Sequence, residues 1–294
     1  MKGKTLIHLN SFLKKIAIVI LMITASFSAL SEEKKIDFLE INWTFNGIFG
    51  TFDRASLQRG YQVYQEVCSG CHSVKHLSYR NLSEKGGPEF SIEEAKAIAS
   101  QFEIQDGPNS DGEMFMRSAR LSDKFAKPYP NVEASTAANG GAYPPDMSVL
   151  AKARVGGADY IYSLLLGYEE APENFDLDDG VYYNKYMPGK KIKMSEPLSD
   201  GVVEYTDGTE SSKIQMAKDV TNFLVWASEP HLESQHRMGF KTIIYLIILI
   251  TLVYMSKQKV WSRFGSKPEE DEETFDKIEK AVSEYEGEDP KTFK

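Results

Sequence analysis

The clearest periodic pattern lies between residues 53 and 67, where apolar side chains recur every three or four positions. That spacing places them on one face of an α-helix. Asp53 is a favourable N-cap, so the pattern predicts a helix that begins at Asp53 and runs towards residue 68. The apolar positions of this face are Leu57, Tyr61, Tyr64 and Val67.

Three further segments have helical patterns. Ser91 and Glu94 have the spacing of a capping box, which predicts a helix from there to residue 102. Residues 212–227 contain an apolar stripe at helical spacing and predict another helix. Residues 146–167 predict a helix in two pieces, broken at Gly156-Gly157.

The segments between these helices are unusually long. Residues 105–145 and 171–205 are rich in Gly, Pro, Asn and Asp, which predicts loops, with a short hairpin around residues 202–208. Loops of this length usually carry a function or a binding surface. The expected fold is therefore mainly α-helical, with few strands and large loop insertions.

The N-terminal segment has the pattern of a secretory signal peptide. Four lysines and no acidic residue precede Glu32, an apolar run covers residues 16–23, and small residues follow up to residue 31. We therefore expect residues 1–31 to be a signal peptide. The alternative is a retained anchor helix, although the apolar run is short for a membrane span.

A second apolar segment, residues 238–256, predicts a transmembrane helix. It has 19 residues and one charge, Lys241. At 1.5 Å per residue it spans about 28 Å, close to the thickness of the hydrocarbon core of a bilayer. Basic residues follow it directly, so the positive-inside rule predicts that residues 32–237 are exported and that the acidic tail, residues 257–294, is cytoplasmic.

The charge of the chain is strongly acidic. It has 34 basic and 43 acidic residues, a formal net charge of -9, and four of the lysines lie in the expected signal peptide. Such a surface excludes binding to nucleic acid, whereas it would attract a basic soluble partner.

The segment Cys68-Ser69-Gly70-Cys71-His72 matches C-x-x-C-H, the attachment sequence of c-type haem. Two thiols on one turn can form thioether bonds with the two vinyl groups of a porphyrin, and the adjacent histidine can ligate the iron. The chain has only two cysteines, too few for a typical structural zinc site, and no βαβ pattern of a thioredoxin-like protein surrounds them. The motif therefore predicts one covalently bound haem c.

The sequence does not identify the second ligand of the iron as clearly as it identifies His72. A methionine there would suit electron transfer, whereas an open position would suit oxygen or peroxide chemistry. Met194 and Met187 lie in loops downstream of the motif and upstream of the helix predicted at residues 212–227. They are the first two candidates, and the other methionines and His76 stay open as alternatives.

Longer stretches of the chain resemble the cytochrome c1 family, the haem subunits of cytochrome bc1 complexes. The resemblance covers most of the exported part and the anchor. The stretches that carry it are WTFNGIFGTFDRASLQRGYQVYQEVCSGCHSV, QDGPNSDGEMFMR, LSDKFAKPYPN, NGGAYPPDMSVLAKARVGGADYIYSLLLGY, MPGKKIKMSEPL and AKDVTNFLVWASEPHLESQHRMGFK.

The resemblance implies a cytochrome c-like helical domain with large insertions, held to the membrane by one C-terminal helix. It implies Met194 as the axial ligand opposite His72, and Met187 becomes a minor alternative. The other pocket residues that it implies are Arg154, against a haem propionate, and Tyr160 and Pro145 in the pocket wall.

The same resemblance implies an electron-transfer subunit of ubiquinol:cytochrome c oxidoreductase, a complex of the respiratory chain. The chain would accept an electron from the Rieske iron–sulfur protein and pass it to a soluble or anchored cytochrome c, without bond-making catalysis of its own. It would pack beside cytochrome b in a dimeric complex of the bacterial inner membrane, with the haem domain facing the periplasm. The alternatives are a free-standing, membrane-anchored c-type cytochrome and a haem enzyme with an open iron site.

Overall fold

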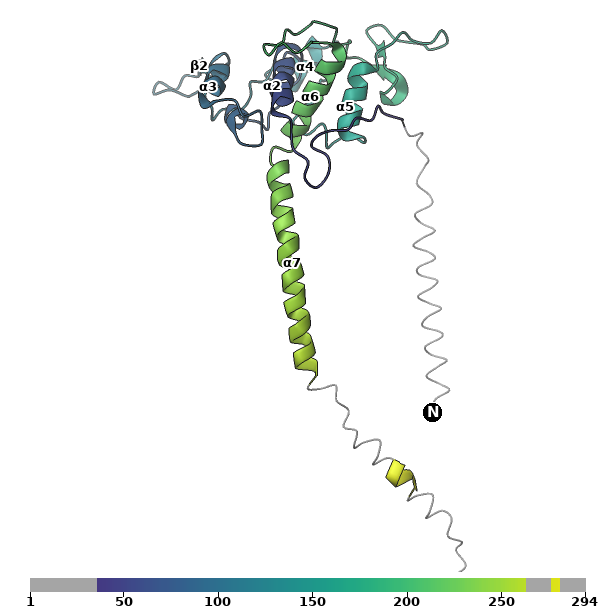
Figure 1. Ribbon diagram of the computed structural model, residues 1–294. Helices are drawn as coiled ribbons and strands as arrows, with labels where there is room; N and C mark the ends of the chain where they lie inside the picture. The colour runs from purple at the N-terminus through teal and green to yellow at the C-terminus, as the bar shows by residue number, and fades with distance from the viewer. Residues whose placement is uncertain (1–35, 263–275, 281–294) are drawn as a thin grey trace, which may run out of the picture. The chain divides into compact units, whose positions relative to one another are not determined.

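A computed structural model describes residues 36–262 and 276–280 of the chain (Figure 1). The chain divides into two compact units. Unit 1 contains the described residues up to Asn42 together with Arg54–Ser228, and unit 2 contains Trp43–Asp53 and the described residues from Glu229 onwards. The expected signal peptide, residues 1–31, lies outside the described residues, as does most of the tail.

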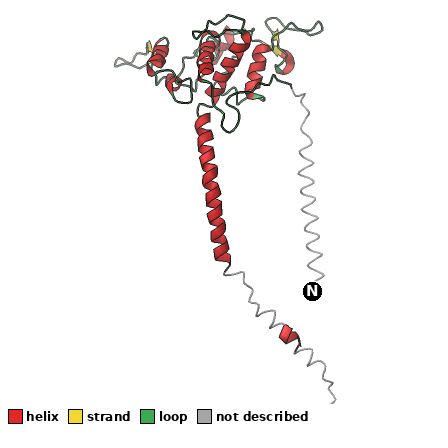
Figure 2. Cartoon of the chain, in the orientation of Figure 1, coloured by secondary structure: helices red, strands yellow, loops and turns green. Residues whose placement is uncertain are grey.

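Unit 1 is mainly helical, as expected, and Figure 2 shows how short its strands are. Its two sheets are both antiparallel and two-stranded: β1 pairs with β2, and β3 pairs with β4. The elements are α2 (Arg54–Val63), the π-helical turn η2 (Tyr64–Cys68), the 3-10 helix η3 (Tyr79–Ser83), α3 (Ile92–Ser100), β1 (Glu103–Asp106), β2 (Phe115–Ser118), α4 (Val132–Ala138), α5 (Gly157–Leu166), β3 (Tyr182–Tyr183), the 3-10 turn η4 (Pro188–Lys190), β4 (Lys191–Ile192) and α6 (Lys213–Ser228).

The core of unit 1 forms where α2 and α6 pack against each other, side by side in Figure 1. Gly60 of α2 lies at the closest approach, because a Cβ atom there would come within 2.1 Å of the backbone oxygen of Asp219. Aromatic rings fill the space beside this crossing. Tyr61 of α2 and Tyr64 of the following π turn contact Phe223 of α6 with ring centroids 5.8 and 5.5 Å apart.

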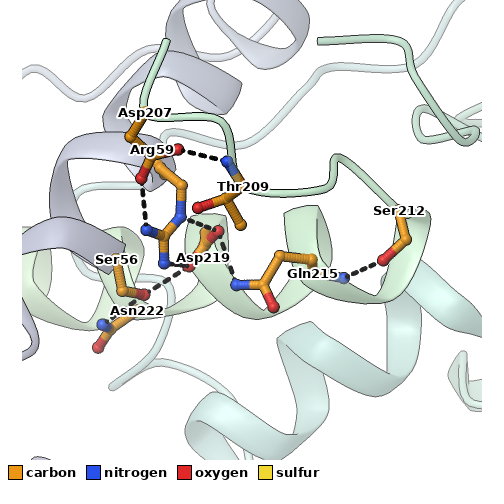
Figure 3. A network of polar contacts seen from close by, with 8 residues as sticks. All are labelled: Ser56, Arg59, Asp207, Thr209, Ser212, Gln215, Asp219 and Asn222. Atoms are coloured by element: carbon orange, nitrogen blue, oxygen red, sulfur yellow. Dashed lines mark hydrogen bonds and ion pairs between the residues drawn. The ribbon is translucent and has the colours of Figure 1, made fainter. Parts of the chain in front are cut away.

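A buried polar network joins the same two helices (Figure 3). The carboxylate of Asp219 has no exposed surface, and it accepts hydrogen bonds from Ser56 Oγ at 2.7 Å and Arg59 Nε at 2.8 Å. Gln215 Nε2 donates a third bond at 3.0 Å. A buried carboxylate is tolerated only when its oxygens are satisfied in this way. The network therefore fixes how α2 is placed along α6.

The helices with strong local signals form as the sequence predicts. Ser91 and Glu94 make both bonds of the capping box at the start of α3, at 3.1 and 2.8 Å. The helix predicted at residues 212–227 is α6, displaced by one residue. The first helix begins at Arg54, one residue after Asp53, and continues through the π turn into the cysteine motif.

The prediction of loops alone over residues 105–145 is wrong. The hairpin of β1 and β2 and the helix α4 lie in or overlap this segment. An ion cluster stabilises the hairpin, because the Arg117 guanidinium of β2 bridges Asp106 of β1 and Asp123, the latter at 2.7 Å. Asn131 caps α4 by accepting a hydrogen bond from Ala134 N at 2.8 Å.

Two shorter predictions are also wrong. Residues 146–156 form turns rather than a helix, and α5 begins only at Gly157, after Gly156 with a φ of 91°. Residues 202–208 form no hairpin. Asp207 Oδ1 there accepts a hydrogen bond from Thr209 N at 2.9 Å, a side-chain bond that favours a turn over a strand ladder.

Unit 2 contains the helix α7, which runs from Leu232 to Trp261. It is long and apolar enough to cross a membrane, and its apolar window is not buried within the protein. This agrees with the transmembrane helix predicted at residues 238–256. α7 begins at Leu232, before the first residue of the predicted span. Residues 276–280 of the tail are helical.

Candidate haem site

The two cysteines lie on one tight turn that follows α2. The π turn closes with a hydrogen bond from Ser69 N to Tyr64 O at 2.8 Å. Cys71 N and His72 N then both donate to Cys68 O, at 3.1 and 2.9 Å. Both thiols are free, Cys71 is exposed and Cys68 is partly exposed. The turn therefore presents two thiols and an imidazole within five residues.

The Cys68 thiol lacks the lowered pKa of an activated thiol. Burial, with a smaller contribution from the nearby Cys71, raises the pKa of the Cys68 thiol to about 12. Thiol–disulfide exchange needs the opposite, a thiol whose pKa is lowered towards neutrality. Among the described residues, no group of three or more His, Cys, Asp or Glu side chains is placed to hold a metal ion such as zinc.

The imidazole of His72 is held in one tautomer. Its Nδ1 lies 2.9 Å from the carbonyl oxygen of Pro145, and a carbonyl only accepts, so Nδ1 carries the proton. Burial lowers the pKa of His72, which favours the neutral ring. Nε2 then keeps its lone pair, the state in which histidine binds a metal.

The loop that follows Pro145 is fixed to the motif by further bonds. Ser73 Oγ donates to Asp146 Oδ2 at 2.6 Å, and Met147 N donates to Ser73 O at 2.8 Å. Lys75 N also donates to Asp146 Oδ2, at 3.1 Å. Sequence reasoning did not select Asp146. The sequence feature that could have indicated Asp146 is its position directly after Pro144 and Pro145, next to the residue expected in the pocket wall.

A second group of predicted residues meets at α5. Tyr160 is buried, and its hydroxyl donates to the sulfur of Met187 at 3.8 Å. Its ring also packs edge-on against Phe38, with centroids 5.6 Å apart. The structure thus brings Tyr160 and Met187 together, a pairing that the sequence did not predict.

Met194 lies two residues beyond β4 and is partly buried. Its backbone oxygen accepts a hydrogen bond from the hydroxyl of Tyr168 at 3.1 Å. The loop is therefore held through the main chain, and this anchor does not use the thioether. Tyr168 is a residue that the sequence analysis did not select. Within the described residues, no hydrogen bond joins Met194 to His72.

Arg154 is exposed, in the turn before α5. Its Nη1 donates to the carbonyl oxygen of Ala153 at 3.1 Å. None of the ion pairs within the described part of the chain involves it, which leaves its charge for a further anion. Pro145 is also exposed and contributes its carbonyl to His72.

The residues fit a covalently bound haem. The turn supplies two thiols without disulfide partners and a neutral imidazole whose Nδ1 is already bonded, which is the donor set that haem c requires. The predicted residues fall into two contact pairs, His72 with Pro145 and Tyr160 with Met187, whereas Met194 and Arg154 are placed separately.

Comparisons with known proteins identify the family of the chain. The model of the Cytochrome C1 family matches residues 43–264. Cytochrome b/c1 of Bradyrhizobium diazoefficiens is 47% identical over 239 residues, which cover 75% of this chain and 35% of that protein. The chain therefore spans about a third of that relative.

Two eukaryotic relatives are covered more fully. Cytochrome c1 1, heme protein, mitochondrial, of Arabidopsis thaliana is 44% identical over 240 residues, 82% of this chain and 77% of the relative. Cytochrome c1, heme protein, mitochondrial, of Schizosaccharomyces pombe is 43% identical over 265 residues, 89% of this chain and 85% of the relative.

Proposed function

Because the chain belongs to the cytochrome c1 family, we propose that it is the haem-carrying, electron-transferring subunit of a cytochrome bc1 complex. The observation that carries this proposal is the turn of Cys68, Cys71 and His72, with the Nδ1 of His72 bonded to Pro145 O at 2.9 Å. A relative in Candida albicans, 46% identical over 222 residues, is named as the catalytic subunit of the cytochrome b-c1 complex.

The cofactor is one haem c. Cys68 and Cys71 would hold it by thioether bonds, and His72 Nε2 would be the first axial ligand. Haem supplies one-electron chemistry at its iron, so no bond-making side chain is needed from this protein. The hydrogen bond from Nδ1 to Pro145 orients the ring and makes it a better donor to the metal.

We assign the second axial position to Met194. The family resemblance supports this assignment, and the backbone oxygen of Met194 accepts a hydrogen bond from the hydroxyl of Tyr168. Met187, whose sulfur accepts a hydrogen bond from Tyr160, stays the minor alternative that the resemblance leaves. Methionine opposite histidine raises the reduction potential and suits electron transfer.

The remaining predicted residues line the haem. Arg154 carries an exposed positive charge beside α5, which would offset a haem propionate. Tyr160 and Pro145 would form parts of the pocket wall, and each already contacts one of the ligand candidates, Met187 and His72 respectively.

The electron donor in this proposal is the Rieske iron–sulfur protein, and the acceptor is a soluble or anchored cytochrome c. The net charge of -9 supports a basic acceptor through long-range attraction. The chain would lie beside cytochrome b in a dimeric complex of the respiratory chain.

We further propose that the chain is a protein of the bacterial inner membrane. Residues 1–31 would be a cleaved signal peptide, residues 32–237 the periplasmic haem domain, residues 238–256 the anchor and residues 257–294 a cytoplasmic tail. The length and apolar composition of α7 support the anchor. The lysines and arginine that follow it support the orientation.

Purification in mild detergent tests the complex. An affinity tag on the full chain is expected to co-purify cytochrome b and a Rieske protein, identified by mass spectrometry, and the haem is expected to be reduced when a ubiquinol is added. A haem-loaded chain that purifies alone, and that ubiquinol does not reduce, would instead identify a free-standing carrier.

A further inference from the structure

The loop Trp43–Asp53 of unit 2 exposes two large apolar side chains at its tip. Ile48 is 68% exposed and Phe49 is 77% exposed. From residue 41 to residue 52 the sequence contains no charged side chain. Contiguous exposed apolar surface can mark a site that contacts a protein or a membrane.

The loop has its own packed interior, and it turns the side chains of Ile48 and Phe49 outward. Trp43, Phe45 and Phe52 are buried. The rings of Trp43 and Phe45 stack with centroids 5.5 Å apart, and the ring of Phe52 packs at a tilt against Phe45 with centroids 5.3 Å apart. Thr51 N closes the loop by donating to Thr44 O at 3.0 Å. The interior is therefore already filled by aromatic rings, which leaves the two apolar residues of the tip on the outside.

Glycine makes the tight turn possible. A Cβ atom at position 50 would come within 2.1 Å of the backbone oxygen of Phe45, so only glycine fits there. Gly47 has a φ of 84°, in the left-handed region. These two glycines bracket Ile48 and Phe49 and fix the position of the tip.

The loop is fastened to the first turns of α7. Phe52 N donates to Glu233 Oε1 at 2.9 Å, and His236 Nδ1 lies 3.3 Å from Gly50 O. The rings of Phe49 and Phe240 meet edge-on, with centroids 5.8 Å apart. The tip thus contacts α7 inside its apolar segment, since Phe240 lies two residues beyond Met238, or about 3 Å along the axis.

We propose that this loop is a second membrane contact, in which Ile48 and Phe49 enter the interfacial region of the lipid bilayer beside α7. The inference rests on the proposed membrane anchor. A helix that crosses the bilayer with Phe240 in its apolar segment carries the ring of Phe49 to the same depth. Arg237 and Lys241 on either side of Phe240 are the kind of residues that sit at the level of the lipid headgroups.

Photocrosslinking at position 49 tests the proposal. The full chain with benzoylphenylalanine in place of Phe49 is isolated with its partners and reconstituted into vesicles of phosphatidylcholine and phosphatidylglycerol. After illumination, mass spectrometry is expected to find lipid adducts in a yield similar to that of the same substitution at Phe240. Phe115, an exposed phenylalanine of unit 1, measures the background of non-specific capture. Ile48 is the second site if the first variant does not fold.

Comparison of the loop positions 48 and 49 with position 240 of α7 separates failure of the loop contact from failure of the membrane anchor. One outcome would overturn the membrane contact of the loop and leave the anchor unaffected. In that outcome, lipid adducts form at position 240, whereas positions 48 and 49 give only protein adducts or no adducts above background. Absence of lipid adducts at all three positions would overturn the anchor itself, and with it this proposal.

Discussion

At the scale of single residues, the proposed site depends on which atoms are already occupied by hydrogen bonds. The Nδ1 of His72 is bonded to Pro145 O, so Nε2 is the nitrogen that remains for iron. The sulfur of Met187 is bonded by Tyr160, whereas Met194 is held through its main chain. Sequence spacing ranks Met194 and Met187 closely, and the family resemblance is what favours Met194.

Asp207 is expected to make the stability of the fold depend on pH in the acidic range. Hydrogen bonds from Thr209 N and from Arg59 lower the pKa of Asp207 from 3.8 to about 2. A lowered folded-state pKa contributes stability that is present above pH 3.8 and is lost as the pH falls towards 2. We therefore expect Asp207→Asn to be less stable than the wild type near neutral pH, and the difference to shrink as the pH falls from about 4 to about 2.

Thermal unfolding of the full chain, followed by circular dichroism at a series of pH values, measures this difference. Because the Asp207 side chain is 41% exposed, solvent screening keeps its contribution small. A stability gap that stays constant over the whole acidic range would show that the carboxylate does not act through its charge.

At the scale of elements, the sequence predicts well wherever the signal is local. The start of α3 is determined by Ser91 and Glu94, and α6 and α7 by apolar stretches of the right period or length. The hairpin of β1 and β2 depends on Arg117 meeting carboxylates 6 and 11 residues away, so short windows of sequence do not reveal it.

The candidate site divides in the same way. Cys68, Cys71 and His72 lie on one turn, and their motif is local. The bond from His72 to Pro145 joins residues 73 positions apart, and the contact between Tyr160 and Met187 joins residues 27 apart. Such pairings follow from how α2, α5 and their loops pack, which periodicity alone does not encode.

The crossing of α2 and α6 predicts a sharp effect at Gly60. A Cβ atom there would lie 2.1 Å from Asp219 O and 2.8 Å from Phe223 Cβ, so Gly60→Ala forces the helices apart. We expect a loss of about 1–3 kcal/mol in the free energy of unfolding, the usual cost of overpacking a core. Chemical denaturation of the haem-loaded chain in detergent measures it.

Gly239→Ala in α7 is the matched control, because Gly239 is also a helical glycine and a Cβ atom added there would have no other atom within 4 Å. Alanine favours a helix over glycine by up to about 1 kcal/mol, so this variant is expected to be neutral or slightly more stable. Equal effects of the two substitutions would mean that the close helix crossing is not what constrains Gly60.

At the scale of the whole molecule, the chain combines a helical unit that carries the candidate haem site with a second unit that carries α7. The family match over residues 43–264 extends across both units. Charge and hydropathy patterns alone predicted an acidic, exported and anchored protein, while the identity of the cofactor came from five adjacent residues. The central claim is that this haem has His72 and Met194 as its axial ligands.

Equilibrium redox titration of the haem in Met194→Leu, with Met187→Leu as the matched control, tests that claim most directly. Loss of Met194 is expected to lower the potential by about 100 mV or more, within the roughly 0.8 V over which axial ligands set haem potentials, and to let carbon monoxide bind the reduced iron. Met187→Leu is expected to keep a potential close to that of the wild type. An unchanged potential in Met194→Leu, with the fall appearing in Met187→Leu instead, would contradict the account.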